Sequence, residues 1–368
     1  MLNSIRILDL SRVLAGPLCT MMLGDLGADV LKIERPGAGD DTRSWGPPFD
    51  QRGESAYYLS VNRNKKGAAL DLNKSQDAEL IRELAAGADV VVDNFKPGTL
   101  ESRGIVPARL LEENRNLLWC TVTGFGEEST RVGYDLVVQA ESGWMAITGE
   151  PAGDPMRVGV ALADIIAGKD AAISILAGLV RRFRSRDPVP VSDRHIHISL
   201  AHSARASLIN VAQNSLVTGA DAKRWGNQHP NLVPYQLFHA ADRAMIVAVG
   251  NDSQWKACAH ALGLTDLASD ASVASNAGRL AHRDRIISAV ADRLREKSAA
   301  EWITLLNEAG VPCGVVKSVL ESLAEVDASA LTGIAPSVPG SVRLPPPKLD
   351  EHGDEVRARG WSIFSTHK

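Results

Sequence analysis

The chain contains 368 residues, of which 45% are hydrophobic, and carries a formal net charge of −4. This length is enough for a large core and predicts two domains. The slightly acidic charge balance argues against a nucleic-acid partner and against a basic membrane-binding patch. No stretch reaches the roughly 18 apolar residues of a membrane span, and the first residues lack the apolar core of a signal peptide. We therefore expect a cytoplasmic protein.

The cysteines predict neither disulfides nor a metal site. They are far apart in the sequence and include no CxxC pair. Isolated cysteines of this kind usually behave as small hydrophobic residues of the core. They are Cys19, Cys120, Cys258 and Cys313. We expect no bound metal.

The first 35 residues predict a strand at 5–10, a helix at 18–26 and a second strand at 28–33. This order is typical of a parallel sheet whose strands are joined by helices. A dinucleotide-binding domain begins in the same way, but the first glycines of this chain lack the spacing of its glycine motif. The glycine–lysine loop that holds ATP phosphates is also missing. The predicted fold class is therefore α/β without a nucleotide fingerprint.

Two later strands are predicted to end in loops at the same edge of this sheet. A strand at 89–93 is followed by Asn94, Phe95 and Lys96, and a strand at 119–123 is followed by a glycine. Because ligands bind outside the carboxyl ends of parallel strands, we expect a site along this edge. The neighbouring elements are predicted as a functional loop at 36–55, a strand at 68–72 and a helix at 75–86.

An aspartate stands in the apolar sequence VGVALADIIAG, residues 158–168. A buried acid is costly unless it is hydrogen-bonded, paired or used in chemistry. Small and apolar residues recur at helical spacing over 167–179, which predicts a buried helix. Asp164 would then lie at the N-terminus of that helix, where the helix dipole favours the ionised carboxylate. An ordinary helix cap and a catalytic carboxylate both fit this position.

A change in composition after residue 225 predicts a smaller second domain. Its predicted elements are a strand at 245–249 and helices at 253–262 and 283–295. The predicted domain bounds are 1–200 for the large domain, 225–310 for the small domain, and 311–368 for a C-terminal segment that returns to the large domain.

Several blocks of sequence, spread over nearly the whole chain, match the motifs of a known protein family in the same order. They are SRVLAGPLCTMMLGDLGADVLKIERPGAGDDTR, VNRNKKGAALDL, DNFKPG, TGFG, GYDLVVQAESG, VALADIIAG, GNQHPNLVPYQ and GVPCGVV. In this order they resemble the class III CoA-transferases, the formyl-CoA and carnitine CoA-transferase family. The resemblance implies a large Rossmann-like open parallel-sheet domain and a smaller α/β domain. It also implies an interlocked homodimer of ring-like chains.

The same resemblance implies that Asp164 is the nucleophile of a CoA-transferase. Its carboxylate would attack an acyl-CoA thioester to form an acyl-aspartyl anhydride, which the released CoA would convert to an aspartyl-CoA thioester. A carboxylic acid acceptor would then take the CoA. Exchange of one thioester for another is nearly balanced in free energy. The resemblance therefore implies CoA as a substrate, with no permanently bound cofactor.

By position, the resemblance further implies the residues that bind CoA. They are Leu14 and Ala15 near the thioester, Arg35 at the adenosine phosphates, Leu70, Leu72 and Asn73 in the adenine pocket, Asn94, Phe95 and Lys96 along the pantetheine arm, and Tyr134 and Asp135 beside the reacting carbonyl. Formyl-CoA transferase has an arginine where this chain has Ser102, so the next residue, Arg103, is the candidate for that phosphate contact. The pair Lys65-Lys66 is interpreted as a solvated turn or as cations that steer phosphates.

The blocks GDDTRSWGPPF, YYLSVNRNKK and AKRWGN most closely resemble the succinyl-CoA–glutarate CoA-transferase branch. This implies succinyl-CoA as donor and a four- to six-carbon dicarboxylate as acceptor. The distal carboxylate needs a cation, for which Arg43 is the candidate, with Arg157 and Arg224 as alternatives. His229 is either a substrate contact or a loop histidine bonded to the backbone.

Two alternatives remain open at this point. An α-methylacyl-CoA racemase needs bases on both faces of the α-carbon, and those enzymes place a histidine in the block where this chain has Tyr134. A phenol with a pKa near 10 is a poor base at neutral pH, which argues against racemisation. The other alternative is a non-catalytic acyl-CoA-binding protein, and the presence of Asp164 argues against it.

Overall fold

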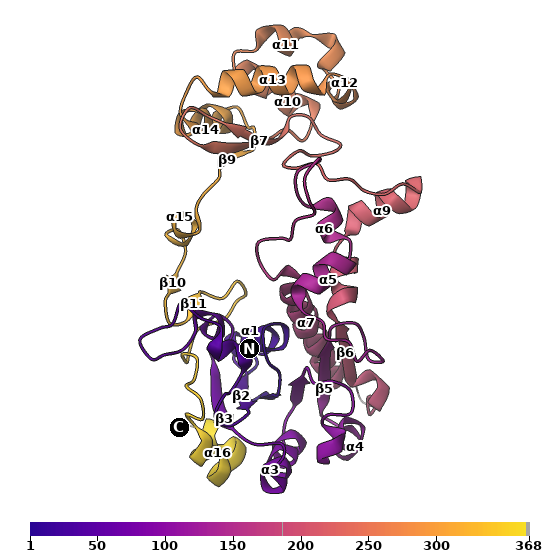
Figure 1. Cartoon of the computed structure of the whole chain (residues 1–368), viewed down its shortest axis with the longest axis vertical. Coiled ribbons are helices and arrows are strands. Elements are labelled where there is room, and N and C mark those ends of the chain that lie inside the picture. The colour runs from indigo at the N-terminus through magenta and orange to yellow at the C-terminus, as the bar shows by residue number, and fades with distance from the viewer. Residues whose placement is uncertain (186, 366–368) are drawn as a thin grey trace. The chain divides into compact units, whose positions relative to one another are not determined.

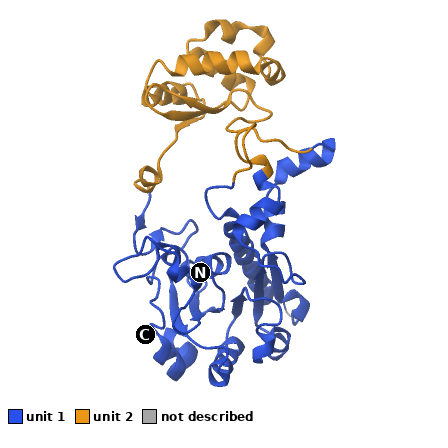
Figure 2. Ribbon diagram, viewed as in Figure 1, with its two compact units in different colours: residues 1–145, 157–220, 326–368 blue, residues 146–156, 221–325 orange. Residues whose placement is uncertain are grey.

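The computed structural model of the chain describes residues 1–185 and 187–365. They form two compact units, which Figure 2 shows in different colours. Unit 1 contains residues 1–145, 157–220 and 326–368, and unit 2 contains residues 146–156 and 221–325. Residue 186 of the predicted large domain and residues 366–368 of the predicted C-terminal segment lie outside the described residues.

Unit 2 differs in extent from the small domain predicted at 225–310. It also includes residues 146–156, because hydrogen bonds join that segment to the chain after residue 221. The N–H of Gly226 donates to the carbonyl of Gly149 at 3.1 Å. Arg224 donates to the carbonyls of Glu150 and Gly153 at 3.2 and 2.8 Å. Contacts between such distant segments leave no periodic pattern in the sequence.

Unit 1 is built on a six-stranded sheet in which all neighbouring strands are parallel (Figure 1). The strands are β1 (Arg6–Asp9), β2 (Asp29–Glu34), β3 (Lys65–Ala69), β4 (Val90–Asp93), β5 (Leu118–Thr123) and β6 (His195–Ser199). Their order, β3-β2-β1-β4-β5-β6, is a doubly wound order with its switch point between β1 and β4. The predicted α/β class with a parallel sheet is confirmed.

Helices cover both faces of this sheet, because successive residues of a strand point to opposite sides. Ile7 packs with α1 and α7 on one face, whereas Leu8 packs with α3, α4 and α16 on the other. These helices are α1 (Ala15–Asp25), α7 (Leu162–Arg184), α3 (Ser75–Ala86), α4 (Pro107–Glu113) and α16 (Gly353–Arg359). The remaining elements of unit 1 are α2 (Ala56–Leu59), α5 (Asp135–Glu141), α8 (Leu200–Ala206), α9 (Ile209–Thr218), β10 (Ala328–Ser329) and β11 (Gly333–Ile334).

Helix α7 begins at Leu162, five residues before the predicted start at 167, so Asp164 lies inside its first turn. The small residues of this helix let it approach α1 closely. A Cβ atom at Gly168 would lie 2.6 Å from the carbonyl oxygen of Ala15, a distance that the backbone does not tolerate. The absence of a side chain at Gly168 therefore lets the second turn of α7 pack against the first turn of α1.

Unit 2 has its own core around a three-stranded antiparallel sheet of order β7-β8-β9. Its elements are β7 (Tyr235–His239), β8 (Ala244–Ala248), β9 (Cys313–Val315), α10 (Asp252–Ala261), α11 (Thr265–Ser269), α12 (Asn276–Ala281), α13 (Arg283–Leu294), α14 (Ala299–Glu308) and α15 (Val319–Leu323). A short helix, α6 (Trp144–Ile147), crosses from unit 1 into unit 2.

All four cysteines are free, and three of them are buried. Within the two described ranges, the helices fall short of the length and apolar character that a membrane crossing requires.

Candidate active site

A cavity of about 180 Å³ lies in unit 1 where β1, β4 and β5 give way to loops. It contains most of the residues that were expected near the thioester and the pantetheine arm. These are Leu14, Ala15, Asn94, Phe95, Lys96, Tyr134 and Asp164. The structure therefore places the expected nucleophile and six of its expected neighbours, from three other sequence blocks, at one edge of the sheet.

Two local contacts shape this cavity. The Asn94 side chain brackets the loop after β1, because it accepts from the N–H of Arg12 at 3.0 Å and donates to the carbonyl of Arg12 at 2.8 Å. Gly124 and Gly133 lie so close that a Cβ atom at Gly124 would be 2.5 Å from the Cα atom of Gly133. This close approach brings the loop after β5 against the segment that ends at the exposed Tyr134.

The Asp164 carboxylate has no hydrogen bond or ion pair with any other residue in the part of the chain that the structure describes. Burial and, to a smaller extent, the nearby Asp135 carboxylate together raise its pKa to about 7. Asp135 accepts hydrogen bonds from the N–H of Ala163 at 2.8 Å and from the Gln139 amide at 2.6 Å. Asp135, from α5, thus caps helix α7, while Asp164 in the first turn of α7 has no hydrogen-bond or ion-pair partner among the described residues.

This arrangement corrects the expectation that the helix N-terminus would favour ionised Asp164. In the first turn of α7, the backbone N–H of Ala163 donates to the Asp135 carboxylate and not to Asp164. Asp135 therefore uses the positive end of the helix dipole and adds a negative charge beside Asp164. It contacts the helix rather than lining the cavity itself.

A second hollow, of about 160 Å³, shares Arg12 and Phe95 with the first. It is lined by the residues expected at the adenine and the adenosine phosphates: Arg35, Leu70, Leu72 and Asn73. The two hollows therefore adjoin at Arg12 and Phe95.

Sequence reasoning missed Arg12 and Asp41, which stand between these two hollows. The Arg12 guanidinium lies 5.6 Å from the centre of the Phe95 ring and 3.5 Å from the Asp41 carboxylate. Asp41 also pairs with Arg35. A cation directly after a parallel strand was the available signal for Arg12.

Tyr57 was also missed. Burial raises the pKa of its phenol to about 12, and the negative charges of Asp164 and then Asp135 contribute. Its ring packs in the same small cluster as Leu14 and Ile165. Tyr57 therefore belongs to the surroundings of the nucleophile, although it comes from α2, more than 100 residues earlier in the chain.

The structure does not support a substrate role for Arg43. Its side chain is only 8% exposed and forms ion pairs of 2.7 Å with Glu34 and with Glu54. It also lies 3.7 Å above the Tyr58 ring and donates to the carbonyl of Pro347. These contacts occupy the guanidinium inside the protein, so Arg43 cannot receive a substrate carboxylate there.

Two other expected cations, Arg103 and Arg157, do not line the cavity that contains Asp164. Arg103 lines a separate hollow of about 350 Å³ together with Arg82 and Arg109. Arg157 donates to the carbonyls of Val158 and Gly159, its own neighbours in the chain.

The sequence suggested a solvated turn at Lys65, but Lys65 is buried in strand β3. Its ammonium donates to Asp9, to the carbonyl of Pro17 and to Asn62, each at 2.9 Å. His229 belongs to unit 2, where its Nδ1 atom accepts from the N–H of Asn231 at 3.0 Å. It therefore has the backbone contact that was one of its two expected roles.

Comparison with known proteins decides the family. The model for CoA-transferase family III matches residues 2–352. The chain belongs to CoA-transferase family III. A succinyl-CoA:glutarate CoA-transferase from Mus musculus is 41% identical over 327 residues, which are 88% of this chain and 74% of that protein. A succinate–glutarate CoA-transferase from Agrobacterium fabrum is 37% identical over 392 residues, covering 99% of this chain and 97% of that protein.

The fold of this family III CoA-transferase also agrees with a solved relative. The crystal structure of a CAIB/BAIF family protein from Brucella suis matches it with a TM-score of 0.84 at 36% identity, covering 97% of this chain and 98% of that chain. The predicted enzyme class, a CoA-transferase, is confirmed by the family and by these relatives. Their names specify CoA transfer, which favours a transferase over the racemase and over the non-catalytic binding protein.

Proposed function

We propose that this family III CoA-transferase moves CoA from succinyl-CoA to a four- to six-carbon dicarboxylate, with Asp164 as its nucleophile. Relatives named for succinyl-CoA and glutarate, at 37% and 41% identity over most of the chain, support the choice of substrates. One structural observation carries the choice of nucleophile. Asp164 is a half-buried carboxylate that has no hydrogen bond or ion pair to the residues the structure describes, and it lies in the cavity that Leu14 and Ala15 also line.

The proposed reaction begins when a carboxylate oxygen of Asp164 attacks the thioester carbonyl of succinyl-CoA. The carbon–sulfur bond breaks, CoA leaves as a thiolate, and an acyl-aspartyl anhydride remains. The thiolate then attacks the aspartyl carbonyl, which releases succinate and forms an aspartyl-CoA thioester. The acceptor carboxylate repeats these two steps in reverse and leaves as its CoA thioester. No bond to phosphate is broken, so no ATP is consumed.

The surroundings of Asp164 suit this role. A carboxylate that lacks hydrogen bonds and is partly desolvated is a stronger nucleophile than one in water. With a pKa raised to about 7, a substantial fraction of Asp164 is ionised at neutral pH. The first N–H groups of α1 precede its first intrahelical bond, from Leu18 to Leu14, and therefore have no partner within the helix. They are the candidates to stabilise the oxyanion that forms during each attack.

The donor is proposed to lie across both hollows. Its adenine would contact Leu70 and Leu72, its phosphates Arg35 and Arg12, and its pantetheine arm the stretch 94–96. Arginine suits the phosphates because its planar group donates several hydrogen bonds at once. Binding would then require the phosphates to compete with Asp41 for both arginines.

Arg131 is the proposed replacement for Arg43 as the partner of the distal carboxylate. It lines the cavity that contains Asp164, and its guanidinium lies 4.1 Å above the Phe125 ring. Arg131 is ion-paired with Glu141, but this pair is exposed to solvent, unlike the buried pairs of Arg43, so a substrate carboxylate can compete for the guanidinium. The Arg131→Gln variant should lose activity with glutarate much more than activity with acetate. Equal losses with both acids would exclude this role.

The direct test of the proposed function uses the purified protein with succinyl-CoA and a panel of acids. Mass spectrometry of the products should show glutaryl-CoA or a similar dicarboxylate thioester in preference to acetyl-CoA. Equal rates with acetate and glutarate would remove the dicarboxylate assignment. The interlocked homodimer and the cytoplasmic location remain predictions, and native mass spectrometry at high dilution tests the first of them.

A further inference from the structure

The loop between β1 and α1 forms the wall of the cavity that carries Leu14 and Ala15. Val13, in the middle of this loop, has a φ of +71°. That left-handed conformation is common for glycine but unfavourable for a β-branched residue, whose side chain collides with its own backbone. Strained residues of this kind persist only where surrounding contacts hold them.

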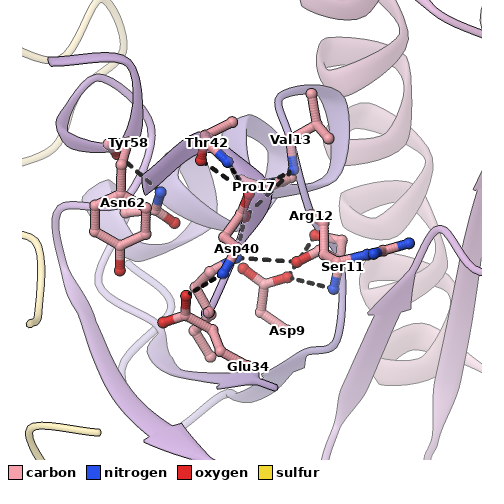
Figure 3. Close-up of polar contacts among 12 residues, drawn as sticks. Asp9, Ser11, Arg12, Val13, Pro17, Glu34, Asp40, Thr42, Tyr58 and Asn62 are labelled. Atoms are coloured by element: carbon pink, nitrogen blue, oxygen red, sulfur yellow. Dashed lines mark hydrogen bonds and ion pairs between the residues drawn. The ribbon is translucent and has the colours of Figure 1, made fainter. Parts of the chain in front are cut away.

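Asp40 supplies the contact that holds Val13 (Figure 3). The N–H of Val13 donates to both carboxylate oxygens of Asp40, each at 3.3 Å. Asp40 is 1% exposed and belongs to the long loop after β2, so it reaches Val13 from a different part of the chain. Asn94 holds the residue before Val13 by two further hydrogen bonds.

The Asp40 carboxylate is itself held in place by Lys32 and Thr42. It pairs with the buried ammonium of Lys32 at 3.1 Å and accepts from the N–H and the hydroxyl of Thr42 at 3.0 and 2.8 Å. Lys32 also donates to the carbonyl of Ser11 at 2.9 Å, in the same loop as Val13. Burial opposes ionisation, but Lys32 and then Thr42 keep the pKa of Asp40 below its usual value.

These contacts extend into a continuous buried network. The N–H of Asp40 donates to Glu34 at 2.8 Å, and Glu34 pairs with Arg43. The cavity wall is therefore connected to ion pairs of the sheet rather than to solvent-exposed groups.

We propose that Asp40 is a positioning residue of the CoA-transfer reaction, which holds Val13 in its strained conformation and so presents Leu14 and Ala15 to the acyl group on Asp164. This inference rests on the proposed function. Without the Asp40 charge, Val13 turns to a negative φ and the first N–H groups of α1 move away from the reacting carbonyl. Asp40 also lines the adenine hollow, but an asparagine at this position keeps the size of the side chain there. The rate of the chemical step therefore falls much more than CoA binding weakens.

The first test compares two matched aspartate variants of the same loop. Asp40→Asn keeps the size of the side chain but removes its charge. We expect a fall in kcat of at least ten-fold, with KM for succinyl-CoA within three-fold of the wild-type value. Asp50→Asn is the control, because Asp50 pairs with Arg52 and contacts neither Val13 nor the cavity. It should leave kcat within two-fold, and a similar result for Asp40→Asn would overturn the proposal.

The second test is a double-mutant cycle with Val13→Gly, because glycine adopts this φ without strain. In the Val13→Gly background, Asp40→Asn should cost less than a third of the fold-change in kcat that it costs in the wild-type background. A purely structural role would give the same fold-change in both backgrounds. That result would overturn the proposal.

The third test does not depend on turnover. A crystal structure of the Asp40→Asn variant should show Val13 at a negative φ, and an unchanged positive φ would contradict the proposal. If wild-type protein transferred no CoA, the proposed function would fail while this test of the loop still gave a result. If Asp40→Asn did not fold, the milder Thr42→Val variant, which removes the 2.8 Å hydrogen bond from the Thr42 hydroxyl to the Asp40 carboxylate, should lower kcat at least three-fold with KM for succinyl-CoA unchanged. An unchanged kcat in Thr42→Val would contradict the proposal.

Discussion

The N–H of Ala163 donates to the Asp135 carboxylate at 2.8 Å, one residue before Asp164. This hydrogen bond places a second negative charge over the first turn of α7, where a helix otherwise attracts an anion. Asp164 is consequently a buried carboxylate that is repelled by its neighbour rather than stabilised by the helix. Burial of Asp164, and then the repulsion by Asp135, raise the pKa of the proposed nucleophile. The raised pKa determines how activity and stability should depend on pH.

The first prediction concerns the pH dependence of the rate. Asp164 attacks only when ionised, and burial together with Asp135 raises its pKa to about 7. We therefore expect kcat/KM to rise with pH up to an inflection near 7. The Asp135→Asn variant removes the repelling charge but keeps a side-chain oxygen for Ala163, so its inflection should move to lower pH. An inflection near 4 in the wild type, or no movement in the variant, would contradict this explanation.

The second prediction concerns stability. The folded pKa of Asp164 lies above its ordinary value of 3.8, so the folded state binds this proton more tightly than the unfolded state. The ionisation of Asp164 therefore lowers the free energy of unfolding as the pH rises from about 4 to about 7, and the loss is complete above that range. The Asp164→Asn variant avoids that loss. It should exceed the wild type by about 1–3 kcal/mol at pH 8, after allowance for partial exposure.

Denaturant unfolding of both proteins at pH 4 and pH 8 measures this difference. The advantage of the variant should largely disappear at pH 4, where the aspartate is protonated in the folded state. A variant less stable than the wild type at pH 8 would show that Asp164 has a stabilising partner.

The third prediction concerns the contact between α1 and α7. Alanine at position 168 would place its Cβ atom 2.6 Å from the Ala15 carbonyl oxygen, so the two helices would have to separate. We expect Gly168→Ala to destabilise the protein by about 1–3 kcal/mol and to reduce kcat. Gly178→Ala on the same helix is the control, because its Cβ would meet the flexible side chain of Leu118 at 2.9 Å. Thermal unfolding and initial rates of both variants measure these effects. Equal losses in Gly168→Ala and Gly178→Ala would contradict the claim that Gly168 is needed for the close contact between α1 and α7.

The fourth prediction separates structure from substrate binding at Arg43. Arg43→Gln leaves the buried Glu34 and Glu54 carboxylates without their cation and should cost about 3–5 kcal/mol of stability. The ratio of kcat/KM for glutarate to that for acetate should not change. Arg52→Gln, in the same loop, removes a more exposed pair with Asp50 and should cost about 1 kcal/mol or less. A selective loss of glutarate activity in Arg43→Gln would restore the original expectation.

Local patterns in the sequence predicted much of the fold. The helix at Ser75–Ala86 has the predicted bounds, because its apolar residues recur at helical spacing and bury one face. The parallel sheet followed from the alternation of strands and helices. The residues around Asp164 were predicted from the family blocks, and the cavity contains most of them. Two of these blocks follow β1 and β4, and the close approach of Gly124 and Gly133 brings the block with Tyr134 to the same edge.

The partners of the buried charges could not be predicted in the same way. Arg43 looked like a free cation because its carboxylates come from Glu34 and Glu54, whose contact with it requires the loop to fold back on β2. Lys65 looked solvated because its partner Asp9 lies on β1, two strands away in the sheet. Such pairs depend on tertiary contacts, for which local sequence spacing gives no signal.

The central claim is that Asp164 becomes acylated during turnover, and hydroxylamine trapping tests it most directly. Tryptic cleavage after Arg157 and Lys169 gives the peptide VGVALADIIAGK, in which Asp164 is the only residue with a side-chain carboxyl. After incubation with succinyl-CoA and hydroxylamine, mass spectrometry should find this peptide as the Asp164 hydroxamate, and Asp164→Asn should give none. Continued CoA transfer without any modification of this peptide would contradict the account.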